Sequence, residues 1–351
     1  MEIVDAIRRV VDGQHLTRTE AESVMNIIMT GKATDAQIAS FLTGLRMKGE
    51  TEEELIGFAQ VIRQKATRVP TSAAVSASLS GTDREMLVDT CGTGGDASGT
   101  FNISTATAFV LAGAGVRVAK HGNRSISSLC GSADVVEALG IRIDLPPEAV
   151  GKCIDEVGIG FLYAPLLHDA MRFVMLARRE MKIRTVFNLL GPICNPAQAT
   201  AQVLGVFSEN LTETMAHVLL ALGARRAFVV HGSDGLDEIT IGGETKVSEV
   251  RDGEVRTYYL VPEDFGIQRA PLTEIQGGNA AQNAEMIREI LSGRPSKRRD
   301  VVLLNAAAGL VVGGRAPTLR AGIELARTSI DSREAYSKLQ RLISLTQSIT
   351  S

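Results

Sequence analysis

Three clusters of polar residues, each following an apolar stretch with strand character, have the residue types that bind a phosphorylated ligand. The first is a glycine-rich run at residues 88–96, which is followed by hydroxyl-bearing residues at 98–105 and an apolar helix. Glycines let backbone amides approach a phosphate closely, and a helix N-terminus carries partial positive charge. This segment therefore predicts phosphate binding.

Two other interpretations of the glycine-rich run explain less of it. An ordinary strand-to-helix turn with a Ser or Thr cap accounts for one or two of the residues, but not for all of them. A dinucleotide site is suggested because Gly92, Gly94 and Ala97 fit the G-x-G-x-x-G/A pattern after a strand. The acidic ribose-binding residue expected about 20 positions later is missing, and the Gly-Lys-Ser/Thr ending of a P-loop is absent as well.

The second cluster follows the next predicted strand and contains two cations, an imidazole, an amide and hydroxyls. It occupies residues 120–128 and begins with Lys120 and His121. Lysine supplies a point charge for phosphate, arginine supplies a two-pronged donor, and Asn123 supplies a carboxamide. A solvated loop would explain any one of these cations, and His121 alone fits either interpretation. Recognition of a polyanion explains the whole run.

The third cluster, at residues 231–238, contains two adjacent acids in a glycine-containing loop. Asp237 and Glu238 again follow an apolar strand-like run. Oxygen ligands suit a hard cation, and magnesium commonly uses one or two protein carboxylates together with substrate phosphates. Adjacent acids in such a loop are also often solvated or cap a helix. The sequence predicts a magnesium site here when the three clusters are taken together.

The elements that must position these clusters fall into an α-helical part and an α/β part. Residues 1–66 contain four segments of helical period, and Thr17, Thr34 and Thr51 start capping boxes with Glu or Gln three positions later. Glycines follow successive helices, where a left-handed residue is favoured; they are Gly13, Gly31 and Gly49. A Ser- and Ala-rich linker is expected at residues 68–82.

Beyond the linker, short β-branched runs alternate with helical stretches. The predicted strands are residues 86–89, 116–119, 159–163, 203–207 and 227–230. Such alternation implies a mainly parallel sheet covered by helices. A hairpin around Asp252 and Gly253 is expected at the edge of the sheet, and the chain returns to helices from residue 280, with the small-residue stretch 301–313 packing closely.

Composition excludes several classes of protein. The 351 residues suggest about two domains, and a net charge of -3 with scattered Lys and Arg argues against a nucleic-acid partner. The four cysteines show no zinc spacing and are expected to be reduced thiols. No apolar run approaches membrane-spanning length, and the N-terminus lacks the pattern of a secretory signal. We expect a soluble cytoplasmic protein with no membrane partner.

The chain resembles the anthranilate phosphoribosyltransferases, whose motif series it matches in order through GTGGD, NIST, KHGNR, RTVFNLLGP and DGLDE. The resemblance spans nearly the whole chain. It implies transfer of the 5-phosphoribosyl group from phosphoribosyl pyrophosphate (PRPP) to the amine of anthranilate in tryptophan biosynthesis, giving N-(5-phosphoribosyl)anthranilate and pyrophosphate. It also implies a fold of the nucleoside phosphorylase/phosphoribosyltransferase type.

The implied fold has a small α-helical domain at residues 1–70, which a helical segment around 168–190 joins, and a hinge connects it to a substrate-binding α/β domain at residues 71–351. The resemblance also implies a homodimer formed through the helical domain. It assigns PRPP to Gly92, Gly95, Asp96, Thr100, Asn102, Ile103, Ser104, Thr105, Lys120, His121, Gly122, Asn123, Arg124, Ser125, Ile126, Ser127, Ser128 and Ser132.

The same resemblance assigns the acceptor and the metal. Anthranilate would contact Gly92, Asn123 and Arg178, and magnesium, as two ions with PRPP, would be held by Ser104, Asp237 and Glu238. A guanidinium can pair with a carboxylate and stack on an aromatic ring, although Arg178 also fits an ordinary surface helix. After the reaction the proton acceptor would be solvent or His121.

The sequence departs from the family pattern at two places, and two rival functions are considered. Leu129 and Cys130 replace more polar residues, and His168 is followed by Asp169 where Pro is usual. A pyrimidine nucleoside phosphorylase has a related fold, but its members tend to be longer and lack KHGNR. A non-catalytic nucleic-acid-binding relative would need a basic surface, whereas this chain is mildly acidic.

Overall fold

The structure is a computed structural model that describes residues 1–72, 86–96, 98–125 and 129–349. Most of the predicted linker, Ala97 of the glycine-rich segment, and Ile126, Ser127 and Ser128 of the second cluster lie outside the described residues. In the part of the chain that is described, no helix combines the length and the apolar character needed to cross a membrane.

Four helices form the N-terminal part of the chain, as the sequence predicts. They are α1 (Ile3–Val11), α2 (Arg18–Met29), α3 (Asp35–Lys48) and α4 (Glu52–Lys65). Each predicted capping box forms, since the hydroxyls of Thr17, Thr34 and Thr51 accept from the backbone amide three residues later. The three glycines that follow α1, α2 and α3 have positive φ angles, which a side chain would disfavour.

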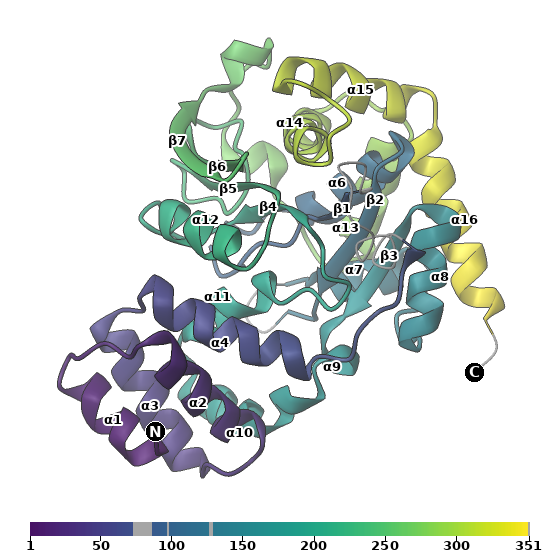
Figure 1. Ribbon diagram of the computed structural model, residues 1–351. Coiled ribbons are helices and arrows are strands. Elements are labelled where there is room, and N and C mark those ends of the chain that lie inside the picture. The colour runs from purple at the N-terminus through teal and green to yellow at the C-terminus, as the bar shows by residue number, and fades with distance from the viewer. Residues whose placement is uncertain (73–85, 97, 126–128, 350–351) are drawn as a thin grey trace.

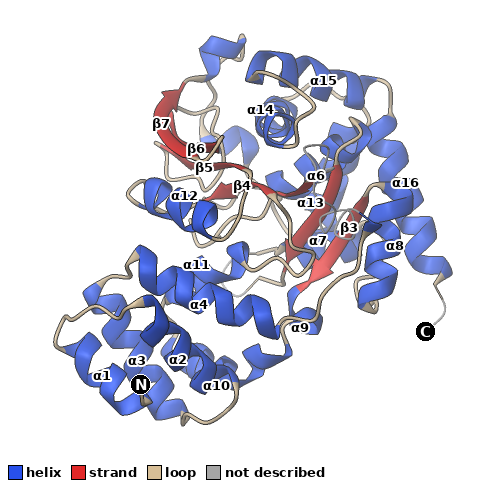
Figure 2. Cartoon of the chain, viewed as in Figure 1, coloured by secondary structure: helices blue, strands red, loops and turns tan. Residues whose placement is uncertain are grey.

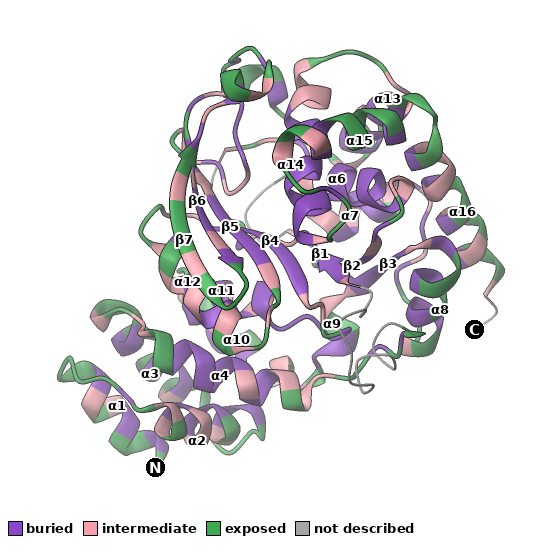
Figure 3. Ribbon diagram, turned by 45° about the horizontal axis from the view of Figure 1, so that its top comes forward, coloured by how far each residue is buried: buried purple, intermediate pink, exposed green. Residues whose placement is uncertain are grey.

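The second part contains a seven-stranded sheet with the order β3-β2-β1-β4-β5-β6-β7 (Figure 2). Its strands are β1 (Leu87–Asp89), β2 (Arg117–Gly122), β3 (Ile159–Tyr163), β4 (Ala201–Gly205), β5 (Arg226–Gly232), β6 (Thr245–Arg251) and β7 (Glu254–Leu260). The first five are parallel, whereas β6 and β7 form the predicted antiparallel hairpin. In Figure 3 the edge strand β7 is the exposed one and its neighbours are largely buried.

The strand order reverses between β1 and β4, because β1 pairs with β2 on one side and with β4 on the other. Ligands of open α/β sheets bind at the carboxyl ends of the strands beside such a switch point. The three polar clusters follow β1, β2 and β5, so they all emerge at this edge of the sheet.

Four of the five predicted strands differ from their predicted bounds by one or more residues, and in β2 and β4 buried polar residues belong to the strand. β2 continues through Lys120 and His121, which are only 3% and 4% exposed and extend the strand beyond its apolar run. β4 begins two residues earlier than predicted and includes Gln202, whose side-chain amide donates to the Pro192 carbonyl oxygen at 2.9 Å. At the other end of β4, the Phe207 amide leaves the ladder and donates to Thr93 Oγ1 at 3.1 Å.

The remaining helices cover both faces of the sheet. They are α6 (Ile103–Gly113), α7 (Ser132–Ala138), α8 (Pro147–Val157), α9 (Ala164–Leu167), α10 (Arg172–Met181), α11 (Val186–Ile193), α12 (Leu211–Ala221), α13 (Ala280–Leu291), α14 (Lys297–Val312), α15 (Leu319–Asp331) and α16 (Glu334–Ser348), with 3-10 turns at Asp169–Met171, Pro262–Phe265 and Leu272–Ile275. The small-residue helix α14 packs on β4, β5 and α6, as expected from its sequence.

Two hydrophobic cores result from this arrangement. One contains Val203 and Phe228 and lies on the α14 face of the sheet. The other contains their sequence neighbours Leu204 and Val229 and joins the opposite face to α1–α4 and α10–α12. Helix α10 therefore packs with the N-terminal helices (Figure 1). Arg63 of α4 ties the two parts together by donating to the backbone oxygens of Ile193 and Leu222 at 2.8 and 2.9 Å.

Candidate active site

The glycine-rich segment after β1 forms an open loop beside the end of β4. Gly94 and Gly95 are exposed and have φ angles of 64° and 75°, which favour glycine. Thr93 anchors the loop, because its amide donates to the Gly205 carbonyl oxygen at 2.9 Å. The structure thus presents a glycine loop just before α6, in the arrangement that the sequence predicts for phosphate binding.

The loop after β5 brings Asp237 directly against this glycine loop. The Gly94 amide donates to Asp237 Oδ2 at 2.8 Å. A Cβ atom at Gly92 would lie 2.8 Å from the same oxygen, and one at Gly205 would lie 1.5 Å from the Asp237 carbonyl oxygen. Glycine is therefore required at position 205 so that two loops distant in sequence can meet, and a side chain at position 92 would displace the Asp237 carboxylate.

Three carboxylates crowd together where these loops meet. Burial, followed by the neighbouring Asp96 and Glu238 carboxylates, raises the pKa of Asp237 well above its usual range. Burial also raises the pKa of Glu238 to about 8; Asp96 contributes to that increase, whereas Lys120 opposes it. Asp96 Oδ2 is itself buried with no hydrogen-bond partner among the described residues. Clustered, desolvated carboxylates of this kind are stabilised by a bound cation.

The donor set fits magnesium, because it offers hard oxygen ligands and an unsatisfied buried oxygen. Two of the predicted metal ligands, Asp237 and Glu238, lie in the cluster. The third, Ser104, is linked to it through the Ser104 backbone amide, which lowers the pKa of Glu238. Asp96, which the sequence assigns to PRPP alone, is an additional member of the same carboxylate cluster.

Lys120 lies beneath the N-terminus of α6. Its ammonium donates to the Thr90 carbonyl oxygen at 2.8 Å and to Ser104 Oγ at 3.0 Å. The same charge lowers the pKa values of Asp89 and Glu238, although burial is the larger effect on both. The lysine therefore connects the first and third predicted clusters.

The other predicted ligands near the start of α6 have different environments. Asn102 is the N-terminal residue before the helix, and its Oδ1 accepts from Asn283 Nδ2 at 2.9 Å. Ile103 is buried, and the buried hydroxyl of Thr105 has no hydrogen-bond partner among the described side chains and backbone. Thr100 forms an isolated antiparallel bridge with Gln276.

The loop after β2 is fixed against the start of α7. Ser132 Oγ accepts from the Asn123 amide at 3.2 Å and lies 3.3 Å from the Asn123 carbonyl oxygen, to which it can donate. A Cβ at Gly122 would lie 2.3 Å from Ser132 Oγ, so glycine permits this contact. The structure thus brings the predicted residues Gly122, Asn123 and Ser132 together.

Arg124 and Ser125 face α7 in this structure. The Arg124 guanidinium pairs with Asp134 at 3.0 Å and Glu137 at 2.5 Å, and it lies 5.8 Å from the centre of the Tyr163 ring. The Ser125 amide donates to the Asp134 carboxylate at 3.3 Å. Binding of a phosphate by Arg124 would require it to exchange these acidic partners.

His121 lies in a buried polar cluster that the sequence did not reveal. Its ring centre is 5.2 Å from that of His168, and its backbone amide donates to Asp89 Oδ1 at 3.2 Å. Asn195 Nδ2 donates to the other oxygen of Asp89 at 2.7 Å. Neither ring nitrogen of His121 forms a hydrogen bond of normal distance and angle with a described group. The Gly191 backbone lies close enough to the ring to favour its charged form slightly.

Burial makes both rings weak bases. It lowers the pKa of His121 to about 3, with His168 and Lys120 adding to the effect, and it lowers the pKa of His168 to about 4. His121 is therefore neutral at physiological pH and accepts a proton poorly. Solvent is the better of the two proton acceptors considered from the sequence.

These shifts predict that mild acid weakens the contribution of the two rings to the stability of the fold. Unfolded histidine has a pKa of about 6.5, so below that pH the unfolded chain binds protons that the folded chain excludes until about pH 4. The contribution of the neutral rings is complete above pH 6.5 and is lost as the pH falls. We expect the stability of the wild type relative to the variant His121→Gln/His168→Gln to fall by about 2 kcal/mol per histidine between pH 6.5 and 5, as measured by urea titration of both proteins. The raised pKa values of Asp237 and Glu238 affect both proteins equally, and an equal change of stability in the two would show that the rings contribute nothing.

Arg178 lies on α10, among the helices of the N-terminal part. Its guanidinium is 5.4 Å from the centre of the Phe187 ring, and burial lowers its pKa. No hydrogen bond or ion pair joins its side chain to any residue that the structure describes. A partly desolvated guanidinium without a partner is suited to bind a carboxylate.

Arg184 is a further cation near the site that sequence reasoning did not select. Its Cδ lies 3.6 Å from the position of a Cβ built on Gly95, and its guanidinium stacks 4.5 Å from the centre of the Phe207 ring. Its carbonyl oxygen accepts from Arg46 of α3 at 2.9 Å. The RTVFNLLGP motif begins at this arginine, but its proximity to the glycine loop depends on tertiary packing. His168, Asp89 and Asn195 were missed for the same reason.

Two family sequence patterns match the chain. The pattern described as "Glycosyl transferase family, helical bundle domain" matches residues 4–66, and the one described as "Glycosyl transferase family, a/b domain" matches residues 84–336. Among similar proteins, the anthranilate phosphoribosyltransferase of Symbiobacterium thermophilum is 57% identical over 96% of this chain and 95% of its own length. The anthranilate phosphoribosyltransferase of Pelotomaculum thermopropionicum is 56% identical over 99% of this chain and 98% of its own length.

Comparison with solved structures identifies the same family as the comparison of sequences. The anthranilate phosphoribosyltransferase of Thermus thermophilus has a TM-score of 0.90 at 43% identity and covers 98% of this chain and 100% of its own. The Saccharomyces cerevisiae enzyme in complex with PRPP and Mg has a TM-score of 0.88 at 27% identity. The match covers 99% of this chain and 98% of that one. The phosphorylase and the nucleic-acid-binding relative are therefore not favoured. The chain belongs to the anthranilate phosphoribosyltransferase family.

Proposed function

We propose that the chain transfers the 5-phosphoribosyl group of PRPP to the amine of anthranilate, giving N-(5-phosphoribosyl)anthranilate and pyrophosphate in tryptophan biosynthesis. The observation that carries this proposal is the meeting of the glycine loop, Lys120 and the Asp96–Asp237–Glu238 carboxylates at the switch point of the sheet. Amides and a lysine beside a cation site are the groups that a diphosphate leaving group requires.

Breaking the bond between the anomeric carbon and pyrophosphate places negative charge on the departing group. The glycine-loop amides beyond Thr93 and Gly94, whose amides are already paired, and the N-terminus of α6 lie where they can stabilise that charge, and Lys120 supports them from below. Magnesium would be held by Ser104, Asp237 and Glu238, with Asp96 beside them, and would neutralise phosphate oxygens when bound. We propose two ions with PRPP. The remaining predicted PRPP ligands lie at the end of β2, after it in the sequence and at the start of α7.

The acceptor needs orientation more than it needs a base. The amine of anthranilate is a weakly basic aromatic nitrogen that is unprotonated at neutral pH, so it can attack directly. We propose that Arg178 binds its carboxylate, with Asn123 and Gly92 completing the acceptor site. The proton released after attack passes to solvent.

A direct assay tests the proposed reaction. The purified protein is mixed with PRPP, anthranilate and magnesium, and the loss of anthranilate fluorescence is followed. We expect loss that requires PRPP and stoichiometric release of pyrophosphate. Unchanged fluorescence from folded protein would contradict the proposal, and phosphate-dependent cleavage of a pyrimidine nucleoside would instead identify the phosphorylase alternative.

Arg178→Gln is expected to raise the KM for anthranilate by about 10- to 100-fold, because a charged hydrogen-bonded pair is lost. The KM for PRPP should change by less than about twofold, since the proposed PRPP ligands are untouched. Arg179→Gln is the matched control, because it removes an exposed arginine from the same helix. Equal effects of the two substitutions on the KM for anthranilate would refute the role of Arg178.

We also propose a cytoplasmic homodimer with an N-terminal helical domain at residues 1–70, which the helical segment around 168–190 joins, and an α/β domain at 71–351. Apolar side chains on the N-terminal helices support dimerisation there, since Val4, Val11 and Met47 are 42%, 66% and 83% exposed. The free state of all four cysteines is consistent with a reducing compartment. Light scattering of the purified protein at several concentrations tests the dimer.

A further inference from the structure

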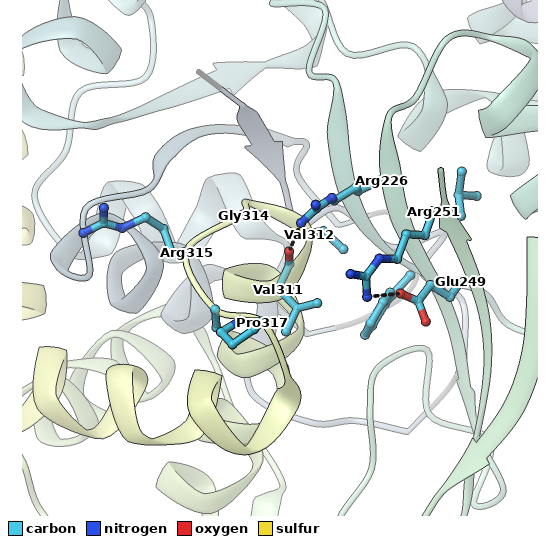
Figure 4. Close-up of a pocket in the computed structure, with 11 residues that line it drawn as sticks. Arg226, Glu249, Arg251, Val311, Val312, Gly314, Arg315 and Pro317 are labelled. Carbon is cyan, nitrogen blue, oxygen red and sulfur yellow. Dashed lines mark hydrogen bonds and ion pairs between the residues drawn. The ribbon is translucent and has the colours of Figure 1, made fainter. Parts of the chain in front are cut away.

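A cavity of about 300 Å³ lies at the opposite end of the sheet from the candidate active site. Arg226 starts β5 and Arg251 ends β6, whereas the active-site loops follow the carboxyl ends of β1, β2 and β5. The cavity is closed on its other side by the end of α14 and the turn after it (Figure 4). Its volume is at the lower end of the range for ligand pockets, about 300–1,000 Å³.

Two arginines face each other across this cavity in register. Arg226 and Arg251 are directly opposite partners in the antiparallel β5–β6 pair, so their side chains lie on the same face of the sheet. Like charges at directly opposite positions destabilise a sheet. The two guanidinium groups therefore repel each other, and the Glu249 and Asp252 carboxylates beside Arg251 offset this repulsion only in part.

The acceptors already present satisfy these arginines only in part. Arg226 donates to the Val311 carbonyl oxygen at 3.2 Å. Arg251 is 50% exposed and lies 3.9 Å from Glu249 and 3.5 Å from Asp252, distances too long for good hydrogen bonds. Each guanidinium has five N–H donors, so both keep donors for a planar, two-oxygen ligand.

The walls of the cavity limit the charge and character of that ligand. Apolar groups of Phe228, Val311, Ala316 and Pro317 line it. Glu249 and the carbonyl end of α14 are negative, and they oppose a second negative charge on the ligand. A single carboxylate on an apolar body matches this combination better than a phosphate does.

We propose that this cavity binds a small monocarboxylate with an apolar body, held by Arg226 and Arg251. The carboxylate lies between the two guanidinium groups and relieves their repulsion, and the apolar body packs against Phe228 and the end of α14. This site is separate from the acceptor site at Arg178.

Isothermal titration calorimetry with 3-phenylpropionate tests the proposal, because this probe has the required carboxylate and no amine. We expect saturable binding with a millimolar or lower Kd. In Arg226→Gln/Arg251→Gln the Kd should rise at least about tenfold. Arg315→Gln is the matched control, since that arginine lines the rim but points away from the pair in Figure 4; its Kd should stay within about twofold.

Further arms of the titration separate this site from its alternatives. Arg178→Gln should retain binding, which distinguishes the cavity from the acceptor site. No saturable heat at 10 mM probe, unchanged binding by the double variant, loss of binding in Arg178→Gln, or equally tight binding of inorganic phosphate would overturn the proposal.

Discussion

Asp237→Asn combined with Glu238→Gln is expected to lower kcat/KM by about a thousandfold at millimolar magnesium. The two substitutions keep the size of the side chains and remove two of the three charges that make the carboxylate cluster attractive to a cation. The Gly94 amide can still donate to an amide oxygen at position 237, as it does to the carboxylate at 2.8 Å. Steady-state kinetics across a range of magnesium concentrations measures the loss.

The same variant should be no less stable than the wild type when magnesium is absent. Burial and mutual repulsion raise the pKa values of Asp237 and Glu238, so the charged cluster destabilises the metal-free fold. Urea unfolding in a chelator measures this effect. Asp252→Asn with Glu254→Gln is the matched control, because it removes two acids from the exposed β6–β7 turn. Wild-type turnover by the double variant at positions 237 and 238 would exclude the metal assignment.

The sequence predicts the elements because the signals that form them are local. The capping threonines of the N-terminal helices, the Asp252–Gly253 turn and the alternation of strands with helices all depend on residues within a few positions of each other. Strand ends were less accurate where buried polar groups take part. The sequence predicts that the strand ends at Lys120, but Lys120 is buried and hydrogen-bonded inside β2.

The site was predicted as three separate clusters, and the contacts between them were not. Only the tertiary structure places Asp96 with Asp237 and Glu238, or His168 against His121. A sequence motif indicates the type of ligand that a loop binds. The motif does not indicate that Arg124 pairs with Asp134 and Glu137 when no phosphate is present. Those two acids lie beside Arg124 only because α7 packs there.

Lys120→Met is expected to lower kcat/KM by about 100- to 1,000-fold, the range for loss of one preorganised donor to developing negative charge. It should also destabilise the fold by about 3 kcal/mol at neutral pH, because buried carboxylates lose a compensating charge. Lys338→Met is the matched control. That lysine is partly buried on α16, and it donates to the Val157 carbonyl oxygen at the end of α8 at 2.7 Å instead of to the active-site loops.

The pH dependence of this destabilisation separates an electrostatic role of Lys120 from a packing role. With Lys120 present, the pKa of Asp89 is about 6 and that of Glu238 about 8, and the ammonium lowers both. Removing the ammonium raises the pKa values of Asp89 and Glu238 further. The folded chain then holds protons that the unfolded chain, with carboxyl pKa values of about 4, has released. Stability then declines as pH rises. The loss on Lys120→Met should therefore be larger at pH 8 than at pH 5, whereas a loss of packing alone would be the same at both.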